Sequence, residues 1–254
     1  MLEIIQLPVL NDNYIYLLHE PVGGKTAVVD PALAQPVLDE LQRRGWHLDF
    51  IFNTHHHSDH VGGNLALKQH SGCRILAPQA DSHRIPGIDQ ALSDGDKIAL
   101  GAVNFSILAT PGHTSGHIVF YADEEQVLFC GDTLFVMGCG RLFEGSPEQM
   151  WQSLQKLRAL PPQTKVYCAH EYTLANGRFA LTVEPDNAVL NARMGEVKKL
   201  RSENIPTVPS TIALERATNP FFRADEASVK AAVGQPDASP LAVFTEIRKR
   251  KDKF

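Results

Sequence analysis

The densest group of potential metal ligands in this chain is the seven-residue stretch 54–60, which reads Thr-His-His-His-Ser-Asp-His. Four histidines and one carboxylate in seven residues exceed what the packing of a loop requires. Imidazole nitrogen and carboxylate oxygen are ligands that divalent transition metals take, and catalytic sites keep one position open for water. One ion therefore cannot use all of these groups. The stretch predicts two neighbouring metal ions of about three protein ligands each, with more ligands later in the chain.

The histidines directly follow a run that is rich in β-formers, so they are expected where a buried strand ends in a loop. If the chain stays extended there, side chains two residues apart point to the same side. His55 and His57 would then form one pair, and His56 would point away from it. The loop would carry Asp59 and His60 to a second ligand position nearby.

Three later segments each place one histidine or aspartate directly after a β-rich run. They contain His113 in Thr-Pro-Gly-His-Thr, Asp132 in Cys-Gly-Asp-Thr and His170 in Cys-Ala-His-Glu. These segments supply the additional ligands that two ions would need.

Short β-rich runs separated by turn residues dominate the chain up to about residue 170, which predicts a mixed α/β domain with an antiparallel start. Its expected strands are residues 4–9, 14–18, 26–29, 48–52, 74–77, 97–100, 103–108, 118–121, 127–130 and 165–168. Its expected helices are residues 36–44, 64–69 and 146–160, the last with Ser146 as N-cap and Gln149 able to complete a capping box.

The β signal fades after residue 170, and apolar residues then recur at helical spacing. Helices are expected at residues 172–182, 187–203, 225–232 and 240–249. We therefore expect a catalytic domain over residues 1–169 and a small all-helical domain over residues 170–254.

Composition narrows the class of protein. A net charge of -5 and a pI near 6.1 argue against nucleic acid as a partner, although the tail at 248–253 is locally basic. No apolar run approaches the ~18 residues of a membrane span, and no secretory signal stands at the N-terminus. The four cysteines form no Cys-x-x-Cys pair, so we expect reduced thiols. A cytoplasmic monomer that acts on a small molecule, with no membrane or nucleic-acid partner, is the expectation.

The motif Thr-His-x-His-x-Asp-His, followed by Pro-Gly-His-Thr, Gly-Asp-Thr and a late histidine, resembles the metallo-β-lactamase superfamily. That resemblance implies an αββα sandwich. Four further segments look like the glyoxalase II family of hydroxyacylglutathione hydrolases, and together the motifs cover nearly the whole chain. They lie at residues 131–135, 138–145, 169–173 and 219–223.

The resemblance to glyoxalase II implies seven metal ligands in two sets of three with one bridging carboxylate. The first set is His55, His57 and His113, the second is Asp59, His60 and His170, and the bridge is Asp132. Zinc is the favoured metal, with iron and manganese as alternatives, since all three accept histidine and carboxylate ligands.

The implied reaction is hydrolysis of S-D-lactoylglutathione to D-lactate and glutathione, the second step of methylglyoxal detoxification. A bridging carboxylate brings two dications to about 3.5–4 Å, where they acidify one shared water. The resulting hydroxide would attack the thioester, with Asp59 and Asp132 as the catalytic carboxylates. The thiolate leaving group is weakly basic, so no strong general acid is required.

The glutathione contacts of the family map onto Arg141, Tyr172, Arg248 and Lys251, and onto position 143. Arg248 and Lys251 stand at i and i+3 of an expected helix, so they would face the same way toward a carboxylate. Phe143 stands where some members of the family carry tyrosine, which removes a hydroxyl from the expected site.

Other readings remain open at this stage. One is another hydrolase of the superfamily, such as a lactonase or a β-lactamase. A second is a mononuclear iron dioxygenase that acts on glutathione persulfide, although a complete second set of ligands argues against it. The third is a metal-binding adaptor without activity, and this hypothesis does not explain why seven potential ligands occur in this order.

Overall fold

The structure, a computed structural model, describes residues 1–254. It divides into two compact units. The first unit comprises residues 1–109 and 115–131, and the second comprises residues 110–114 and 132–254. The boundary expected after residue 169 lies inside the second unit. The division into domains 1–169 and 170–254 stays a prediction.

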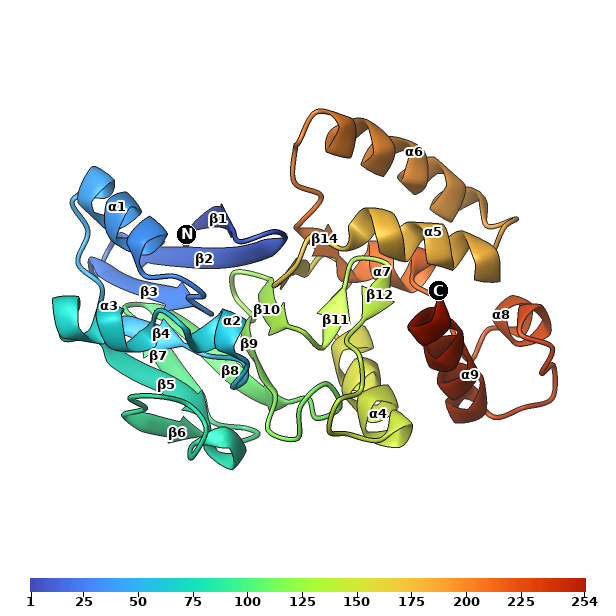
Figure 1. Ribbon diagram of the computed structural model, residues 1–254, viewed down its shortest axis with the longest axis horizontal. Coiled ribbons are helices and arrows are strands. Elements are labelled where there is room, and N and C mark those ends of the chain that lie inside the picture. The colour runs from blue at the N-terminus through green and yellow to red at the C-terminus, as the bar shows by residue number, and fades with distance from the viewer. The chain divides into compact units, whose positions relative to one another are not determined.

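The first unit begins with a six-stranded sheet in the order β1-β2-β3-β4-β5-β6 (Figure 1). Its first three strands pair antiparallel, as expected, and the pairs from β3 to β6 are parallel. The strands are β1 (Glu3–Val9), β2 (Asn13–Glu20), β3 (Lys25–Val29), β4 (Phe50–Phe52), β5 (Arg74–Pro78) and β6 (Gln90–Leu92).

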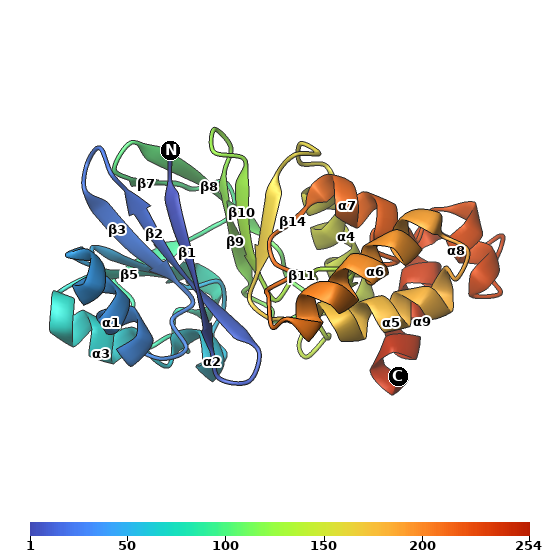
Figure 2. The same ribbon diagram turned by 90° about the horizontal axis from the view of Figure 1, so that it is seen from above.

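The first unit also contains four antiparallel strands that face this sheet (Figure 2). Phe52 of β4 stacks on Phe120 at 5.0 Å between ring centroids and contacts Phe105 at 5.7 Å. Tyr16 of β2 lies 5.5 Å from Phe129. These aromatic contacts bury the facing sides of two layers, as in a sandwich. The four strands are β7 (Lys97–Leu100), β8 (Val103–Ala109), β9 (Ile118–Ala122) and β10 (Val127–Gly131).

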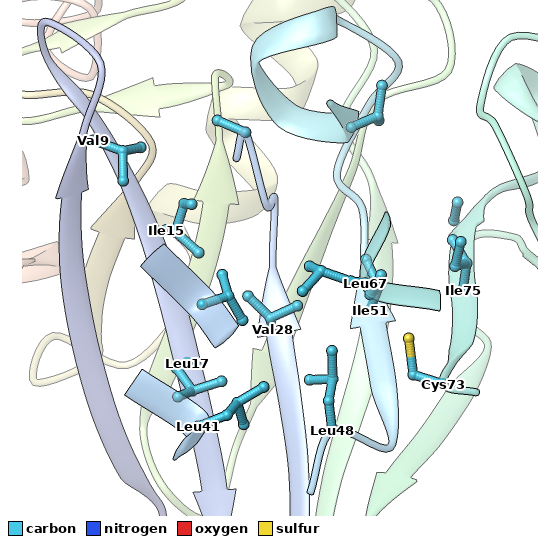
Figure 3. Close-up of a cluster of buried hydrophobic side chains, with 14 of the residues drawn as sticks. Val9, Ile15, Leu17, Val28, Leu41, Leu48, Ile51, Leu67, Cys73 and Ile75 are labelled. Carbon is cyan, nitrogen blue, oxygen red and sulfur yellow. The ribbon is translucent and has the colours of Figure 1, made fainter. Parts of the chain in front are cut away.

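Helices cover the other side of the first sheet. Helix α1 (Gln35–Arg44) buries Val37 and Leu41, which lie four residues apart on one helical face. They join a buried cluster that includes Leu17 and Val28 of the sheet (Figure 3). Each such side chain stabilises the fold by about 1.5–3 kcal/mol when buried. The remaining short helices of this unit are α2 (Ser58–Val61), α3 (Asn64–Ser71) and the 3-10 helix η1 (Gln79–Asp81).

The second unit is mainly helical. Phe221 lies between Phe179 and Phe244, at centroid distances of 6.1 and 5.9 Å, and Trp151 contacts Phe244 at 5.7 Å. These rings connect helices from both ends of the unit into one core. Its elements are β11 (Leu134–Phe135), β12 (Gly138–Cys139), α4 (Pro147–Arg158), β13 (Lys165–Cys168), α5 (Thr173–Val183), α6 (Ala188–Ser202), β14 (Ser210–Thr211), α7 (Ile212–Thr218), α8 (Ala227–Ala232) and α9 (Pro240–Lys253).

The expected elements are present with ends that differ by a few residues, and the capping box of Ser146 and Gln149 is confirmed. Helix α9 continues four residues beyond the expected end at residue 249. Those residues are polar and carry no apolar period, so the pattern could not predict them. The segments that were not expected are α2, η1, β6, the hairpin of β11 and β12, β14 and α7. None has enough residues to establish a period on its own.

No helix of the chain combines the length and the apolar composition that a membrane crossing needs. All four cysteines are buried and free, which confirms the expectation that they form no disulfide.

Candidate metal centre

The histidine stretch begins two residues after β4, in the first unit. The Nε2 atom of His55 lies 3.0 Å from Nδ1 of His57, and their rings are 4.6 Å apart. The Nδ1 atom of His56 instead lies 3.0 Å from Asp81, a buried carboxylate that also accepts from Arg84 at 2.5 Å. The alternation expected for these histidines therefore holds in their geometry. That His55 and His57 bind a metal stays a prediction.

Asp30, which follows β3, holds this stretch in place. Its buried carboxylate accepts from the backbone N–H of Thr54 at 2.8 Å and from its hydroxyl at 2.7 Å. The same carboxylate lies 3.0 Å from Nδ1 of His60. Because a carboxylate only accepts, Nδ1 of His60 carries the proton and Nε2 presents its lone pair. Asp30 thus fixes both the position of the loop and the orientation of one expected ligand.

Asp59 is partly exposed, with 37% of its side chain accessible, whereas His55 and His60 are buried. The side-chain amide of Asn13 donates to Asp59 Oδ2 at 3.0 Å. The same oxygen lies 3.6 Å from Nε2 of His60. Asp59 and His60 therefore present a carboxylate oxygen and a ring nitrogen side by side, as the sequence motif predicted.

The second unit brings together three further candidates, each at the end of a short segment. Nε2 of His113 lies 3.3 Å from one carboxylate oxygen of Asp132, and Nε2 of His170 lies 3.4 Å from the other. Nδ1 of His113 donates to the carbonyl of Arg141 at 2.8 Å, so Nε2 of that ring presents a lone pair to Asp132. A carboxylate oxygen and an imidazole lone pair that face each other fit a cation held between them. Asp132 thus has one imidazole near each carboxylate oxygen, and that it bridges two metal ions stays a prediction.

The distances within each unit fit a divalent metal. Metal–ligand bonds of about 2.0–2.1 Å at tetrahedral angles place neighbouring ligand atoms about 3.3 Å apart. In the second unit, Nε2 of His113 and Nε2 of His170 lie 3.3 and 3.4 Å from the oxygens of Asp132. In the first unit, the His55 and His57 nitrogens lie 3.0 Å apart. The donor set of imidazole and carboxylate is the one that zinc, iron and manganese accept.

Cysteine thiols stand close to these residues in sequence. Burial raises the pKa of the Cys139 thiol to about 11 and that of Cys168 to about 12. Both thiols therefore stay protonated at neutral pH, a form that binds metals poorly.

The expected glutathione contacts all lie in the second unit, with different exposures. Arg248 is nearly buried and donates to the carbonyl of Cys139 at 3.0 Å, whereas the Arg141 side chain is 61% exposed. Lys251 is partly buried, with its Nζ 5.4 and 5.3 Å from the ring centroids of Phe179 and Phe254. Burial, followed by the nearby Arg248 and Arg141, lowers the pKa of Lys251. These cations form what we call the cation cluster, consisting of Arg141, Arg248 and Lys251.

Two aromatic side chains contact expected metal ligands. The ring of Tyr172 stacks on that of His170 at 4.8 Å and an interplanar angle of 3°. The ring of Phe143 meets His113 edge to face at 5.2 Å, and 60% of Phe143 is exposed. Both rings therefore lie beside the candidate ligands, where an exposed face is available to a substrate.

Sequence reasoning did not identify the residues that orient the expected ligands. Asn13 orients Asp59 and Asp30 orients His60, whereas Asp81 pairs with His56. Their place near strand ends does not show which partner each of them meets. Asp252 was also missed, because a single aspartate in a basic tail does not stand out as a functional residue. For all four, the partner lies far away along the chain.

Comparison with known proteins assigns the chain to a family. The family model for the metallo-beta-lactamase superfamily matches residues 10–170, and the model described as hydroxyacylglutathione hydrolase C-terminus matches residues 171–254. The hydroxyacylglutathione hydrolase of Methylococcus capsulatus is 58% identical over 254 residues, covering 100% of this chain and 99% of that protein. The one from Rhodospirillum rubrum is 51% identical over 253 residues, with coverage of 100% and 99%.

Solved structures show the same fold at lower identity. ETHE1 from Myxococcus xanthus has a TM-score of 0.71 and 24% identity, and covers 97% of this chain and 90% of its own. The BLEG-1 B3 metallo-beta-lactamase has a TM-score of 0.66 and 23% identity, with coverage of 87% and 99%. These neighbours confirm the expected fold class, a metallo-β-lactamase sandwich with a helical C-terminal part. The chain belongs to the metallo-beta-lactamase superfamily and, within it, to the hydroxyacylglutathione hydrolase family.

Proposed function

We propose that this protein hydrolyses glutathione thioesters, with S-D-lactoylglutathione as substrate and D-lactate and glutathione as products. The observation that carries the proposal is identity of 51–58% over the full length of relatives named hydroxyacylglutathione hydrolase. The match includes the helical residues 171–254, which contain Tyr172, Arg248 and Lys251. A simple lactone carries no carboxylate, so a lactonase would not need the cation cluster.

We propose two divalent metal ions per chain. His55, His57 and His113 would hold one ion, Asp59, His60 and His170 the other, and Asp132 would bridge them. The distances within each unit and the fold family support this arrangement, with zinc favoured and iron or manganese as alternatives. When bound, such a pair supplies a water nucleophile at neutral pH and polarises the thioester carbonyl.

The residues of the chain then have distinct roles. Asp30 and the Arg141 carbonyl fix the tautomers of His60 and His113, so that Nε2 is the binding nitrogen in both. Asn13 holds Asp59 at the open edge of its unit, where that carboxylate can accept a proton from water. The leaving thiolate needs no proton from the protein, because thiols are far more acidic than alcohols or amines.

Substrate binding is assigned to five residues of the second unit. The cation cluster would bind carboxylate of the glutathione moiety, which is the chemistry that charged hydrogen bonds favour. Tyr172 and Phe143 would contact the peptide next to the candidate ligands. In this proposal, residues 1–169 carry the catalysis together with His170, and residues 170–254 carry most of the glutathione recognition. Monomeric state and cytoplasmic location stay predictions, the latter supported by four free cysteines.

A substrate comparison tests the proposed function. Purified protein is assayed with lactoylglutathione, a lactone, a cephalosporin and glutathione persulfide under the same conditions. We expect kcat/KM to be highest for lactoylglutathione. Preference for one of the other three would assign the protein to a different reaction of the same fold.

A further inference from the structure

Asp252 is an unusual residue for its position. The last eight residues, 247–254, contain five lysines and arginines and a single carboxylate, that of Asp252. It stands in the last turn of α9, where the helix dipole favours cations and disfavours anions. The helix dipole therefore gives no reason for an aspartate here, and its contacts must be considered instead.

The Asp252 carboxylate binds two arginines from separate segments of the second unit. Its Oδ1 accepts from Nε and Nη2 of Arg248 at 3.0 and 2.7 Å. Nε of Arg141 lies 3.7 Å from the same oxygen. Arg248 also donates to the carbonyl of Cys139 in β12 at 3.0 Å. Asp252 thus joins α9 to the segment that follows the hairpin.

The three members of the cation cluster repel one another. The neighbouring Arg248 and Arg141 add to burial in lowering the pKa of Lys251, whereas Asp252 opposes that shift. Arg248 is held by the protein on several sides, but the exposed Arg141 side chain has few constraints. Without a shared counterion, repulsion would favour conformations in which Arg141 extends into solvent.

We propose that Asp252 is a positioning residue for substrate binding, which holds Arg141 and Arg248 together so that a peptide carboxylate meets an ordered cation cluster. The inference rests on the proposed function and deepens it. Removal of the Asp252 carboxylate would also make the net charge of the site more positive by one. That charge attracts an anion at long range, but salt screens exposed charges over about 8 Å at physiological ionic strength. Loss of order is therefore expected to outweigh the gain in charge.

The test compares Asp252→Asn with a matched control on the same helix. Glu246→Gln removes the same charge from an i, i+4 pair with Arg250, which is 2.8 Å long and exposed. KM and kcat are measured with lactoylglutathione and with a small thioester that lacks glutathione. Binding of S-hexylglutathione, a thioether that cannot be hydrolysed, is measured by calorimetry.

For Asp252→Asn we expect KM for lactoylglutathione and Kd for S-hexylglutathione to rise on the order of tenfold, which is the value of one charged hydrogen bond. kcat and the hydrolysis of the small thioester should change less than about twofold, because the remote contact acts on binding. Glu246→Gln should resemble wild type, and Asp252→Glu should recover part of the loss. In an Arg141→Gln background the effect of Asp252→Asn should shrink, because the two residues act together.

An unchanged or lower KM in Asp252→Asn would overturn the proposal, as would an equal shift in Glu246→Gln. A fall in kcat without a rise in KM would overturn it as well. Asp252 is partly exposed, so the variant is expected to fold, and the exposed Arg141→Gln variant tests the same contact independently. Absence of lactoylglutathione hydrolysis by the wild type would instead overturn the proposed function and, with it, this inference.

Discussion

Three consecutive histidines occupy three different environments. His55 is fully buried and its ring nitrogen lies 3.0 Å from that of His57, whereas His56 pairs with Asp81. His57→Ala should therefore remove a ligand atom and lower the metal content of purified protein to about half, since one of two sites is lost. His56→Ala should leave metal content nearly unchanged, because that side chain points away from the pair. Elemental analysis of the two variants checks this. Equal loss of metal from both would show that the pair is assigned incorrectly.

Adding one hydroxyl to Phe143 tests whether this side chain contacts the substrate. Its ring is exposed and lies edge to face against His113, at a position where some family members carry tyrosine. Phe143→Tyr keeps the ring and adds one hydroxyl that can bond the glutathione backbone. We expect KM for lactoylglutathione to fall by about fivefold, which corresponds to a hydrogen bond of about 1 kcal/mol, with kcat unchanged. Steady-state kinetics checks this, and a KM that stays the same would place the ring away from the peptide.

At the scale of elements, the hairpin of β11 and β12 depends on one buried carboxylate. Glu215 of α7 accepts from Arg193 at 2.7 Å, Ser210 at 2.5 Å, Asn219 at 2.9 Å and the backbone N–H of Met137 at 2.8 Å. Asn219 in turn donates to two carbonyls of the hairpin strands. The hairpin separates Asp132 from Arg141 in the sequence, so this network fixes the spacing between a candidate ligand and the cation cluster.

Glu215→Ala should lower the free energy of unfolding by about 3–5 kcal/mol, because it leaves the buried Arg193 charge without its partner. Urea unfolding measures the change. Glu246→Ala, which removes a partly exposed carboxylate from α9, is the control and should change the free energy of unfolding far less. A loss of the same small size in Glu215→Ala would mean that the network contributes no more than a surface pair.

Helix α1 has a carboxylate that links its stability to pH. Hydrogen bonds from Arg43, and then from Arg44, lower the pKa of Glu40 to about 2. Because the pKa in the folded state lies below the unfolded value, the contribution is fully present above about pH 4.5 and is lost as the pH falls toward 2. Glu40→Gln should therefore be less stable than wild type at pH 7 by up to about 1 kcal/mol. The difference in urea unfolding should vanish near pH 2, and a difference that persists there would point to packing as its cause.

At the scale of the whole molecule, the long periodic elements and the ligand motifs could be predicted from the sequence. Strands such as β8, which buries Val103, Phe105 and Ile107, and helices such as α6 have enough alternating or helically spaced residues to establish a period. The hairpin of β11 and β12 could not be predicted, because two residues per strand have no period and depend on Glu215, 78 positions from the Met137 N–H that it binds.

The candidate ligands could be predicted for a different reason, since each follows a strand and has side-chain chemistry that is rare in that position. The residues that orient them could not, because their role depends on distant partners. Asp30 approaches His60 only through the pairing of β3 with β4. In the expected substrate site, the contact of Asp252 with Arg141 likewise joins residues 111 positions apart. The sequence also could not predict that Arg141 is exposed and Arg248 buried. The i, i+3 spacing of Arg248 and Lys251 predicts that they share a helical face, but not which residues cover that face.

Titration of metal-free protein with zinc, with lactoylglutathione hydrolysis as the readout, tests the central claim most directly. Seven candidate ligands, three on each ion and one between them, predict no hydrolysis without metal and a rise in rate that continues to about two equivalents per chain. Iron(II) and manganese are titrated in parallel, because the same ligands accept them. Hydrolysis that is complete at one equivalent, or that persists without metal, would contradict the account.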